Sequence, residues 1–191
     1  YKATEGQNYI TVDNSGKKVI YTNNIDNTST SDFKNISLVD LMPYIGDTGV
    51  INQSQHRNSQ FSVKYNGGLK LYDVTDDTSQ KVEISQDKYM IQFSDKTSFN
   101  EQNDFVNRTS SDWHTEWQVE DRSFRVLMNE DYVLQSKHTL VIEYEGQIEG
   151  DANPGTIAWN SFGYRYSAKD STGTEKNMLA EPPKVGMKIK P

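Results

Sequence analysis

The sequence contains no cysteine, and this absence excludes several classes of protein at once. Disulfide scaffolds, thiol nucleophiles and thiolate metal sites all need cysteine. Histidine is also scarce, since only His56, His114 and His138 occur, and they are scattered along the chain. The usual zinc sites draw on clusters of these two residue types. The sequence therefore predicts no cofactor and no metal centre.

Positive charge is in the minority, and long apolar runs are missing. Lys and Arg together number 20 against 27 Asp and Glu, which gives a formal net charge of −7. Nucleic acids and anionic membranes select clustered positive charge, so neither is expected as a partner. No apolar run approaches the length of a membrane-spanning helix. The chain begins with Tyr rather than an initiator Met, and we expect it to be excised from a longer multidomain protein.

What the chain has in quantity is aromatic residues and short alternating segments. Aromatics make up 11% of it, including 11 tyrosines, which argues against disorder. Apolar and polar residues alternate with period 2, and no long stretch has the period of a helix. The expected strands cover residues 9–12, 17–25, 35–41, 60–65, 69–75, 81–84, 88–93, 124–128, 139–145, 156–168 and 184–189. Joined by polar turns, they predict an all-β antiparallel sandwich, with residues 1–191 forming one domain.

Two segments refine this prediction. Asn66-Gly67-Gly68 tolerates positive φ, so residues 60–65 and 69–75 are expected to form a hairpin. Residues 95–120 are rich in Asn, Ser and Asp and interrupt the alternation. We interpret them either as a long functional loop or as a polar insertion with one short helix tucked over a sheet edge.

Two polar residues fall on apolar faces of expected strands. Asp40 shares a face with apolar residues of segment 35–41, and a buried carboxylate is costly unless it is hydrogen-bonded, paired or protonated. Asp40 either ends its strand and caps the turn at Pro43, or is a buried acid with a raised pKa, suited to proton transfer. Asn160 falls among aromatic residues in the middle of segment 156–168, where its amide needs a partner.

These segments carry a resemblance to a known family. Residues 19–27 contain Val-Ile-Tyr-Thr followed by Ile-Asp-Asn. Residues 35–43 contain Asn-Ile followed by Asp-Leu-Met-Pro. This resembles the repeated β-sandwich domains of Gram-positive surface proteins. Residues 158–164 and 181–186 read Ala-Trp-Asn-Ser-Phe-Gly-Tyr and Glu-Pro-Pro-Lys-Val-Gly. They resemble the final strands of such domains in cell-wall-anchored adhesins and pilins, while about residues 52–135 are left uncovered.

The resemblance implies an Ig-like sandwich of the collagen-adhesin type, often carrying an autocatalytic Lys–Asn isopeptide bond. Carried onto this chain, it makes Lys2 the nucleophile, Asn160 the acceptor and Asp40 the acid/base, with ammonia leaving. A desolvated lysine loses its charge and becomes nucleophilic, while a desolvated carboxylic acid stays neutral and donates a hydrogen bond. The implied cross-link ties the first strand to the last.

Other residues compete for these roles. Lys17 and Lys18 are rival nucleophiles, although they follow a turn and are expected to flank a solvated strand end. Glu143 is a rival acid, but the alternation in its segment places it on the face opposite Leu140 and Ile142.

The function implied by the resemblance is structural. The chain is expected to be a monomeric stalk module of a bacterial cell-surface adhesin or pilin-like protein, with neighbouring domains of the same protein as partners. It is expected outside the cell, anchored to the wall through another part of the protein, and to perform no chemistry beyond one self-modification. The alternative is a ligand-binding module in which Trp113 and Trp117, within residues 95–120, hold a glycan or a host matrix protein.

Overall fold

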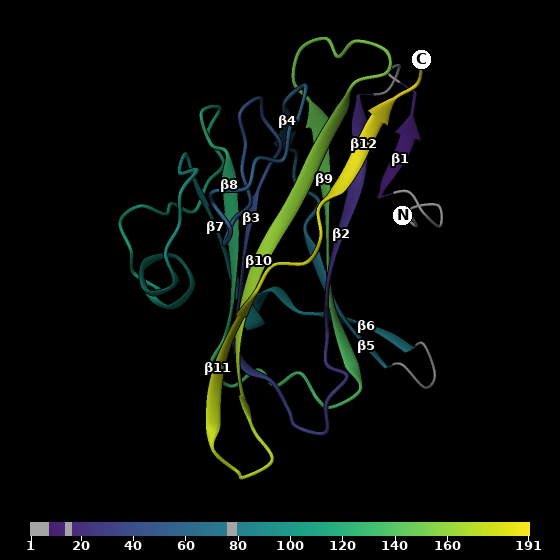
Figure 1. Ribbon diagram of the computed structural model, residues 1–191. Helices are drawn as coiled ribbons and strands as arrows, with labels where there is room; N and C mark the ends of the chain where they lie inside the picture. Colours follow the sequence, from purple (N-terminus) through teal and green to yellow (C-terminus); the bar gives the residue numbers. More distant parts are fainter. Residues whose placement is uncertain (1–7, 14–16, 76–79) are drawn as a thin grey trace.

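Two β-sheets pack face to face in the computed structural model, which describes residues 8–13, 17–75 and 80–191 (Figure 1). The strands are β1 Tyr9–Val12, β2 Lys18–Asp26, β3 Lys34–Leu41, β4 Val63–Tyr65, β5 Lys70–Thr75, β6 Gln80–Ile84, β7 Tyr89–Ser94, β8 Ser123–Met128, β9 His138–Ile148, β10 Ile157–Lys169, β11 Glu175–Ala180 and β12 Val185–Ile189. One sheet runs β1-β12-β10-β3-β8-β7 with β11 also on β10, and the other runs β2-β9-β5-β6 with β4 also on β9. The expected all-β sandwich is confirmed; β1 and β12 are parallel, and the other pairs are antiparallel.

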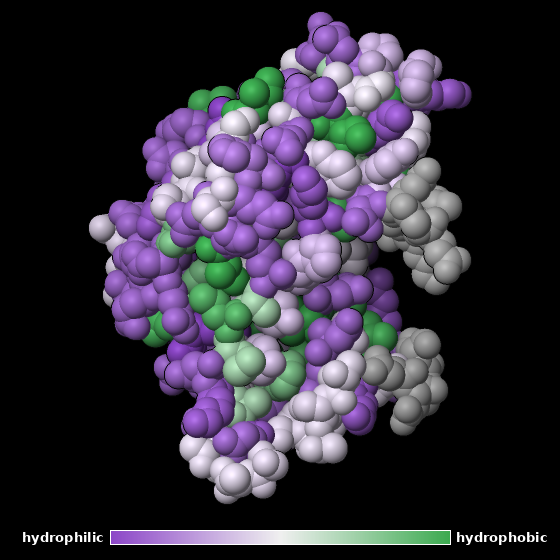
Figure 2. All heavy atoms as spheres, in the orientation of Figure 1, coloured by the Kyte–Doolittle hydropathy of each residue, from purple (hydrophilic) through white to green (hydrophobic). Residues whose placement is uncertain are grey.

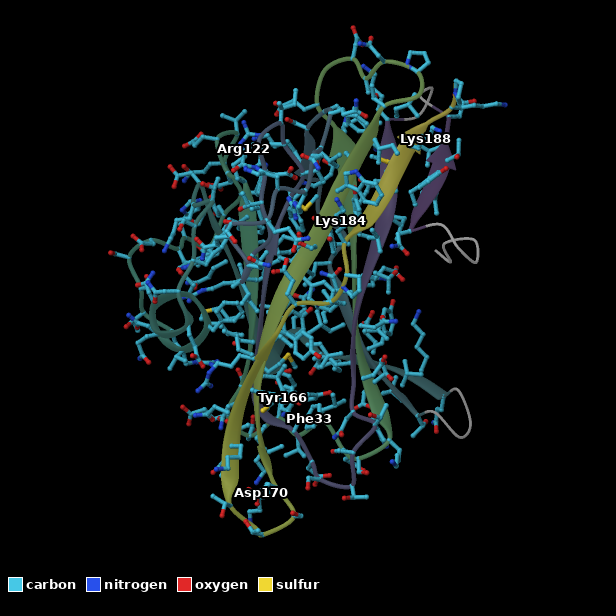
Figure 3. The ribbon with its side chains drawn as sticks, in the orientation of Figure 1. Phe33, Arg122, Tyr166, Asp170, Lys184 and Lys188 are labelled. Atoms are coloured by element: carbon cyan, nitrogen blue, oxygen red, sulfur yellow. The ribbon has the colours of Figure 1, made fainter. Side chains whose placement is uncertain are left out.

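The core lies between the two sheets because the strands alternate buried and exposed residues. In β2, Val19, Tyr21, Asn23 and Ile25 are buried while the residues between them are exposed. One apolar cluster draws on the inner faces of both sheets. At one end of this core the rings of Phe33 and Tyr166 stack with centroids 3.8 Å apart, and Figure 3 shows the two side chains together there. The alternation read from the sequence therefore identifies the inner faces.

The central strand β3 is buried on both faces. Its inner face contributes to the main core, while its outer face is covered by the segment between β7 and β8. The second apolar cluster there consists of Val39, Leu41, Val50, Phe99, Phe105 and Trp113. A six-residue π-helix, Glu101–Val106, packs on β3 and β8. Residues 95–120 are thus an insertion with one short helix, and it covers the outer face of the sheet rather than an edge.

Helical structure is confined to that π-helix and a three-residue 3-10 turn, Gln86–Lys88, within the described parts of the chain. Neither the turn nor the π-helix has the length or apolar character to cross a membrane.

The hairpin expected around Asn66-Gly67-Gly68 is wrong. Strands β4 and β5 both pair with β9 and follow one another along it, with Tyr65 opposite Gly146 and Lys70 opposite Glu143. Gly67 and Gly68 do have positive φ, at 86° and 68°. The backbone N–H of residue 145 in β9 donates to the Gly67 carbonyl, so the segment is a bulge between β4 and β5, which run on in the same direction along β9. Positive-φ glycines suit a bulge as well as a hairpin turn, and local sequence does not separate the two.

The connection between β11 and β12 is held by the carboxylate of Glu181. It accepts hydrogen bonds from the backbone N–H groups of Val50 and Ile51 at 2.9 and 2.8 Å and from Asn52 at 3.2 Å. Lys184, labelled in Figure 3, comes after the two prolines that follow Glu181, and its Nζ donates to the backbone carbonyl of Arg57 at 2.9 Å. These contacts fix the start of β12 against the rest of the fold.

Candidate functional site

A buried polar cluster joins the two sheets at Asp40. This residue is fully buried within β3, so its carboxylate does not cap a turn. Its Oδ2 accepts hydrogen bonds from Asn23 Nδ2 at 2.8 Å, from the Tyr144 hydroxyl at 2.7 Å and from Asn160 Nδ2 at 3.2 Å. Asn160 Nδ2 also donates to the Tyr144 hydroxyl oxygen at 2.8 Å. The cluster ties two strands of each sheet together, since Asn23 and Tyr144 come from one sheet and Asp40 and Asn160 from the other.

Strand register brings these side chains together. Asp40 lies opposite Phe162 in β10, and Asn160 is two residues from Phe162, on the same face. In the facing sheet Tyr144 of β9 lies opposite Tyr21 of β2, and Asn23 is two residues farther along β2. All four polar groups therefore face the space between the sheets.

Burial controls the protonation of this cluster. It raises the pKa of Asp40 from 3.8 to about 6, although the hydrogen bonds from Asn23 and Tyr144 and the charge of Arg57 act in the opposite direction. Burial also raises the pKa of the Tyr144 hydroxyl well above its ordinary value, so this group stays a donor. A carboxylic acid that is readily protonated and lies beside a carboxamide suits proton transfer to and from that amide.

Two oxygens of the cluster lack hydrogen-bond partners. Asp40 Oδ1 and Asn160 Oδ1 are both buried and accept no hydrogen bond from the described residues. An unsatisfied buried acceptor carries a desolvation cost. A proton on Asp40 Oδ1 turns one of these two unsatisfied acceptors into a donor.

The structure brings Asp40 and Asn160 together, whereas the expected nucleophile, Lys2, lies outside the described residues. The rival Lys17 donates to Asp151 at 3.1 Å, and Lys18 is exposed at the start of β2, as anticipated for a solvated strand end. The rival acid Glu143 is half-buried on the outer side of β9, where its Oε2 lies 4.0 Å from a lysine Nζ.

Sequence reasoning missed Asn23 and Tyr144. The alternation in β2 places Asn23 on the buried face between Tyr21 and Ile25, so a signal was present. Tyr144 shares a face with Leu140 and Ile142 in the sequence pattern, which indicates a buried residue but no polar role. Nothing local to either residue indicates that it faces Asp40 across the sandwich, because that contact depends on how the sheets pack.

The two tryptophans of the insertion have structural contacts. Trp113 is 5% exposed, its Nε1 donates to Asp104 Oδ1 at 2.9 Å, and the Arg125 guanidinium lies 4.9 Å from its ring centroid. Trp117 is partly buried, with its ring centroid 5.6 Å from those of Tyr65 and Phe93. The Trp113 ring is therefore covered by protein and presents no free face on which a sugar could stack.

Truncation of the buried ring tests this packing. We expect Trp113→Ala to lower the free energy of unfolding by about 3–5 kcal/mol, because it removes a buried aromatic side chain and leaves a cavity. Trp117→Ala is the matched control and should cost less, since its ring is only partly buried. Urea unfolding of both variants measures the difference, and an unchanged midpoint for Trp113→Ala would contradict the packing.

Comparison with known proteins finds similarity only at the level of structure. No protein-family model and no curated protein sequence matches the chain. It is similar to ACE19, the collagen-binding subdomain of the Enterococcus faecalis surface protein ACE, at 16% identity and a TM-score of 0.45, over 96% of this chain and 94% of that one.

Two further structures show the same kind of similarity. The collagen-binding domain of the Erysipelothrix rhusiopathiae surface protein RspB matches at 12% identity and a TM-score of 0.45, over 90% of this chain and 41% of that one. A collagen-binding domain from a Staphylococcus aureus adhesin matches at 9% identity and a TM-score of 0.38, over 96% of this chain and 93% of that one. In all three cases the similarity is in the path of the backbone, at 16% sequence identity or less.

Proposed function

We propose that this chain is a structural module of a bacterial cell-surface adhesin or pilin-like protein. The observation that carries the proposal is the buried contact between Asp40 and Asn160, because the sequence resemblance implies that these two residues share one site. Hydrophilic residues cover most of the face seen in Figure 2, which suits a spacer surrounded by water. In this proposal the module lies outside the cell, a wall anchor belongs to another part of the protein, and neighbouring domains are its partners.

Within this proposal the cluster supports a self-made isopeptide bond. The neutral amine of Lys2 attacks the side-chain carbonyl carbon of Asn160, forming a carbon–nitrogen bond. The step requires the Asn160 amide to turn so that its unpartnered carbonyl oxygen, rather than Nδ2, faces Asp40. Protonated Asp40 then gives its proton to that oxygen and relays a proton from the lysine nitrogen to the leaving nitrogen. The bond between that carbon and Asn160 Nδ2 breaks and ammonia leaves. As the carbonyl reforms, its oxygen returns the proton to Asp40, which ends in the protonation state in which it began.

The value of such a bond is mechanical. It connects the beginning of the chain to β10, which is not the last strand as expected, because β11 and β12 follow it. The bond therefore shields the chain between Lys2 and Asn160 from a pulling force, while β11 and β12 lie outside the closed loop. It also closes a very long loop, which in chain-entropy models of cross-links corresponds to about 5 kcal/mol of stabilisation. A cysteine-free chain has no disulfide with which to achieve this.

Intact-mass spectrometry tests the bond. We expect the purified protein to be lighter than its calculated mass by one ammonia, and Lys2→Ala, Asp40→Ala and Asn160→Ala each to restore the calculated mass. Lys17→Ala is the control, because Lys17 contacts Asp151 instead, and this variant should keep the deficit. An unmodified parent mass would contradict the bond and leave the cluster as a non-covalent tie between the sheets.

A further inference from the structure

A hollow of about 530 Å³ opens where β7 ends one sheet and β6 ends the other. None of its lining residues belongs to the polar cluster, although the ring of Tyr65 stacks on that of Tyr144 with centroids 6.3 Å apart. Its size falls within the range of small-ligand sites. Tyr65, Ile84 and Tyr89 line it with ring and aliphatic surface, and Lys70, Glu83 and Gln86 line it with polar groups. This combination of an apolar wall with a few convergent polar groups is typical of ligand sites.

The aromatic wall is held rigidly. The ring of Tyr65 has its centroid 5.0 Å from that of Phe93, 5.3 Å from that of Phe124 and 5.6 Å from that of Trp117. Tyr89 is half-buried at the start of β7. A ring fixed by its neighbours loses little conformational freedom when a ligand stacks on it.

The tyrosine hydroxyls of this wall stay neutral. Burial raises the pKa of Tyr65 to about 12, with the neighbouring Tyr89 adding to the shift, and burial raises the pKa of Tyr89 as well. Each hydroxyl therefore donates and accepts hydrogen bonds near neutral pH.

The polar rim carries no net charge. Lys70 Nζ lies 3.9 Å from Glu83 Oε1, and both side chains are more than half exposed. The exposed amide of Gln86 adds a donor and an acceptor. A charged ligand would have to compete with Lys70 or Glu83 for the group of opposite charge, because the two are already paired with each other. A neutral molecule with many hydroxyls can form hydrogen bonds to both. A pyranose ring has this chemistry, with an apolar face of C–H groups and hydroxyls at its edge.

We propose that this hollow binds a neutral pyranose sugar, which stacks on Tyr89 and Tyr65 and is hydrogen-bonded by Lys70, Glu83 and Gln86. The site does not depend on the isopeptide bond, so either proposal can fail without the other. In this proposal the sugar binds to Tyr65 and Tyr89 instead of to Trp113, which is buried, and Trp117 contributes only by packing against Tyr65.

NMR titration of the uniformly ¹⁵N-labelled protein tests the site. The probes are glucose, galactose, mannose and N-acetylglucosamine, with glucuronic acid as the charged comparison. We expect saturable shifts with at least one neutral sugar, centred on the amides of residues 65–70 and 83–91, and an affinity of millimolar order for so small a ligand. No saturable shift with any neutral sugar, or equal binding of glucuronic acid, would overturn the proposal.

Variants separate stacking from nonspecific effects. Tyr89→Ala is expected to weaken binding by about tenfold, and Tyr89→Phe to keep most of it, because the ring remains. Tyr9→Ala is the matched control, since Tyr9 lies in β1, at the opposite end of the sheet from β7, and this variant should bind like the parent. Should Tyr89→Ala not fold, Glu83→Gln, which removes the charge from an exposed acceptor, is expected to weaken binding severalfold. Unchanged binding in the folded variants would contradict the site.

Discussion

The double variant Lys2→Ala, Asn23→Lys is expected to form an isopeptide bond with Asn160 and to lose one ammonia. Asn23 Nδ2 lies 2.8 Å from Asp40 Oδ2, and the same oxygen lies 3.2 Å from Asn160 Nδ2. A lysine at position 23 would start from the same buried face of β2, and burial lowers the pKa of a lysine amine toward its nucleophilic, neutral form. Amine, acid and acceptor amide would then share one cluster. The Lys2→Ala change keeps Asn160 free of the natural chain's own proposed nucleophile.

Position 24 offers a matched control for this experiment. Asn24 is the next residue of β2 and is exposed, so Lys2→Ala, Asn24→Lys places the same amine outside the core and should keep its calculated mass. Adding Asn160→Ala to the position-23 variant should also abolish the loss. Intact mass is measured on folded, monomeric protein. A folded Asn23→Lys protein with its full calculated mass would show that the cluster does not activate Asn160.

Replacement of Asp40 by asparagine is expected to stabilise the protein at neutral pH. The folded-state pKa of Asp40, about 6, lies above its ordinary value of 3.8, so the folded protein binds this proton more tightly than the unfolded chain does. The stability from that proton is complete below about pH 4 and is lost as pH rises through about 6. Ionising Asp40 in the folded protein thus costs about 3 kcal/mol at pH 7.

Asparagine at position 40 avoids this cost. Its oxygen can accept the hydrogen bonds from Asn23, Tyr144 and Asn160, and its amide nitrogen takes the place of Asp40 Oδ1, a buried acceptor that has no donor. In a Lys2→Ala background, we expect the free energy of unfolding of Asp40→Asn to exceed that of its parent by about 1–3 kcal/mol at pH 7. This difference should shrink toward pH 4.

Urea unfolding at a series of pH values between about 4 and 8 measures the effect. Asp131→Asn, a substitution of an exposed aspartate, is the control and should follow the parent curve. Parallel curves for Asp40→Asn and its parent would mean that Asp40 does not carry the linked proton.

Much of the candidate site was accessible from the sequence. Parity within a strand places Asp40 and Asn160 on buried faces, because side chains alternate sides of a sheet with period 2. The structure confirms that both are buried and that they contact one another. Tyr144 and Asn23 completed the cluster only in three dimensions, because they reach Asp40 from the opposite sheet.

The sequence by itself determined where most strands run and which of their faces point inward, since both follow from local periodicity. Only the tertiary structure decided which strands pair, because backbone donors and acceptors are the same in every strand and carry no label for a partner. For that reason β4 and β5 both align on β9 instead of forming a hairpin. It also decided that the insertion buries Trp113 over the outer face of β3. The apolar contacts that Trp113 makes there come from residues distant in sequence, so the polar residues around it did not indicate its burial.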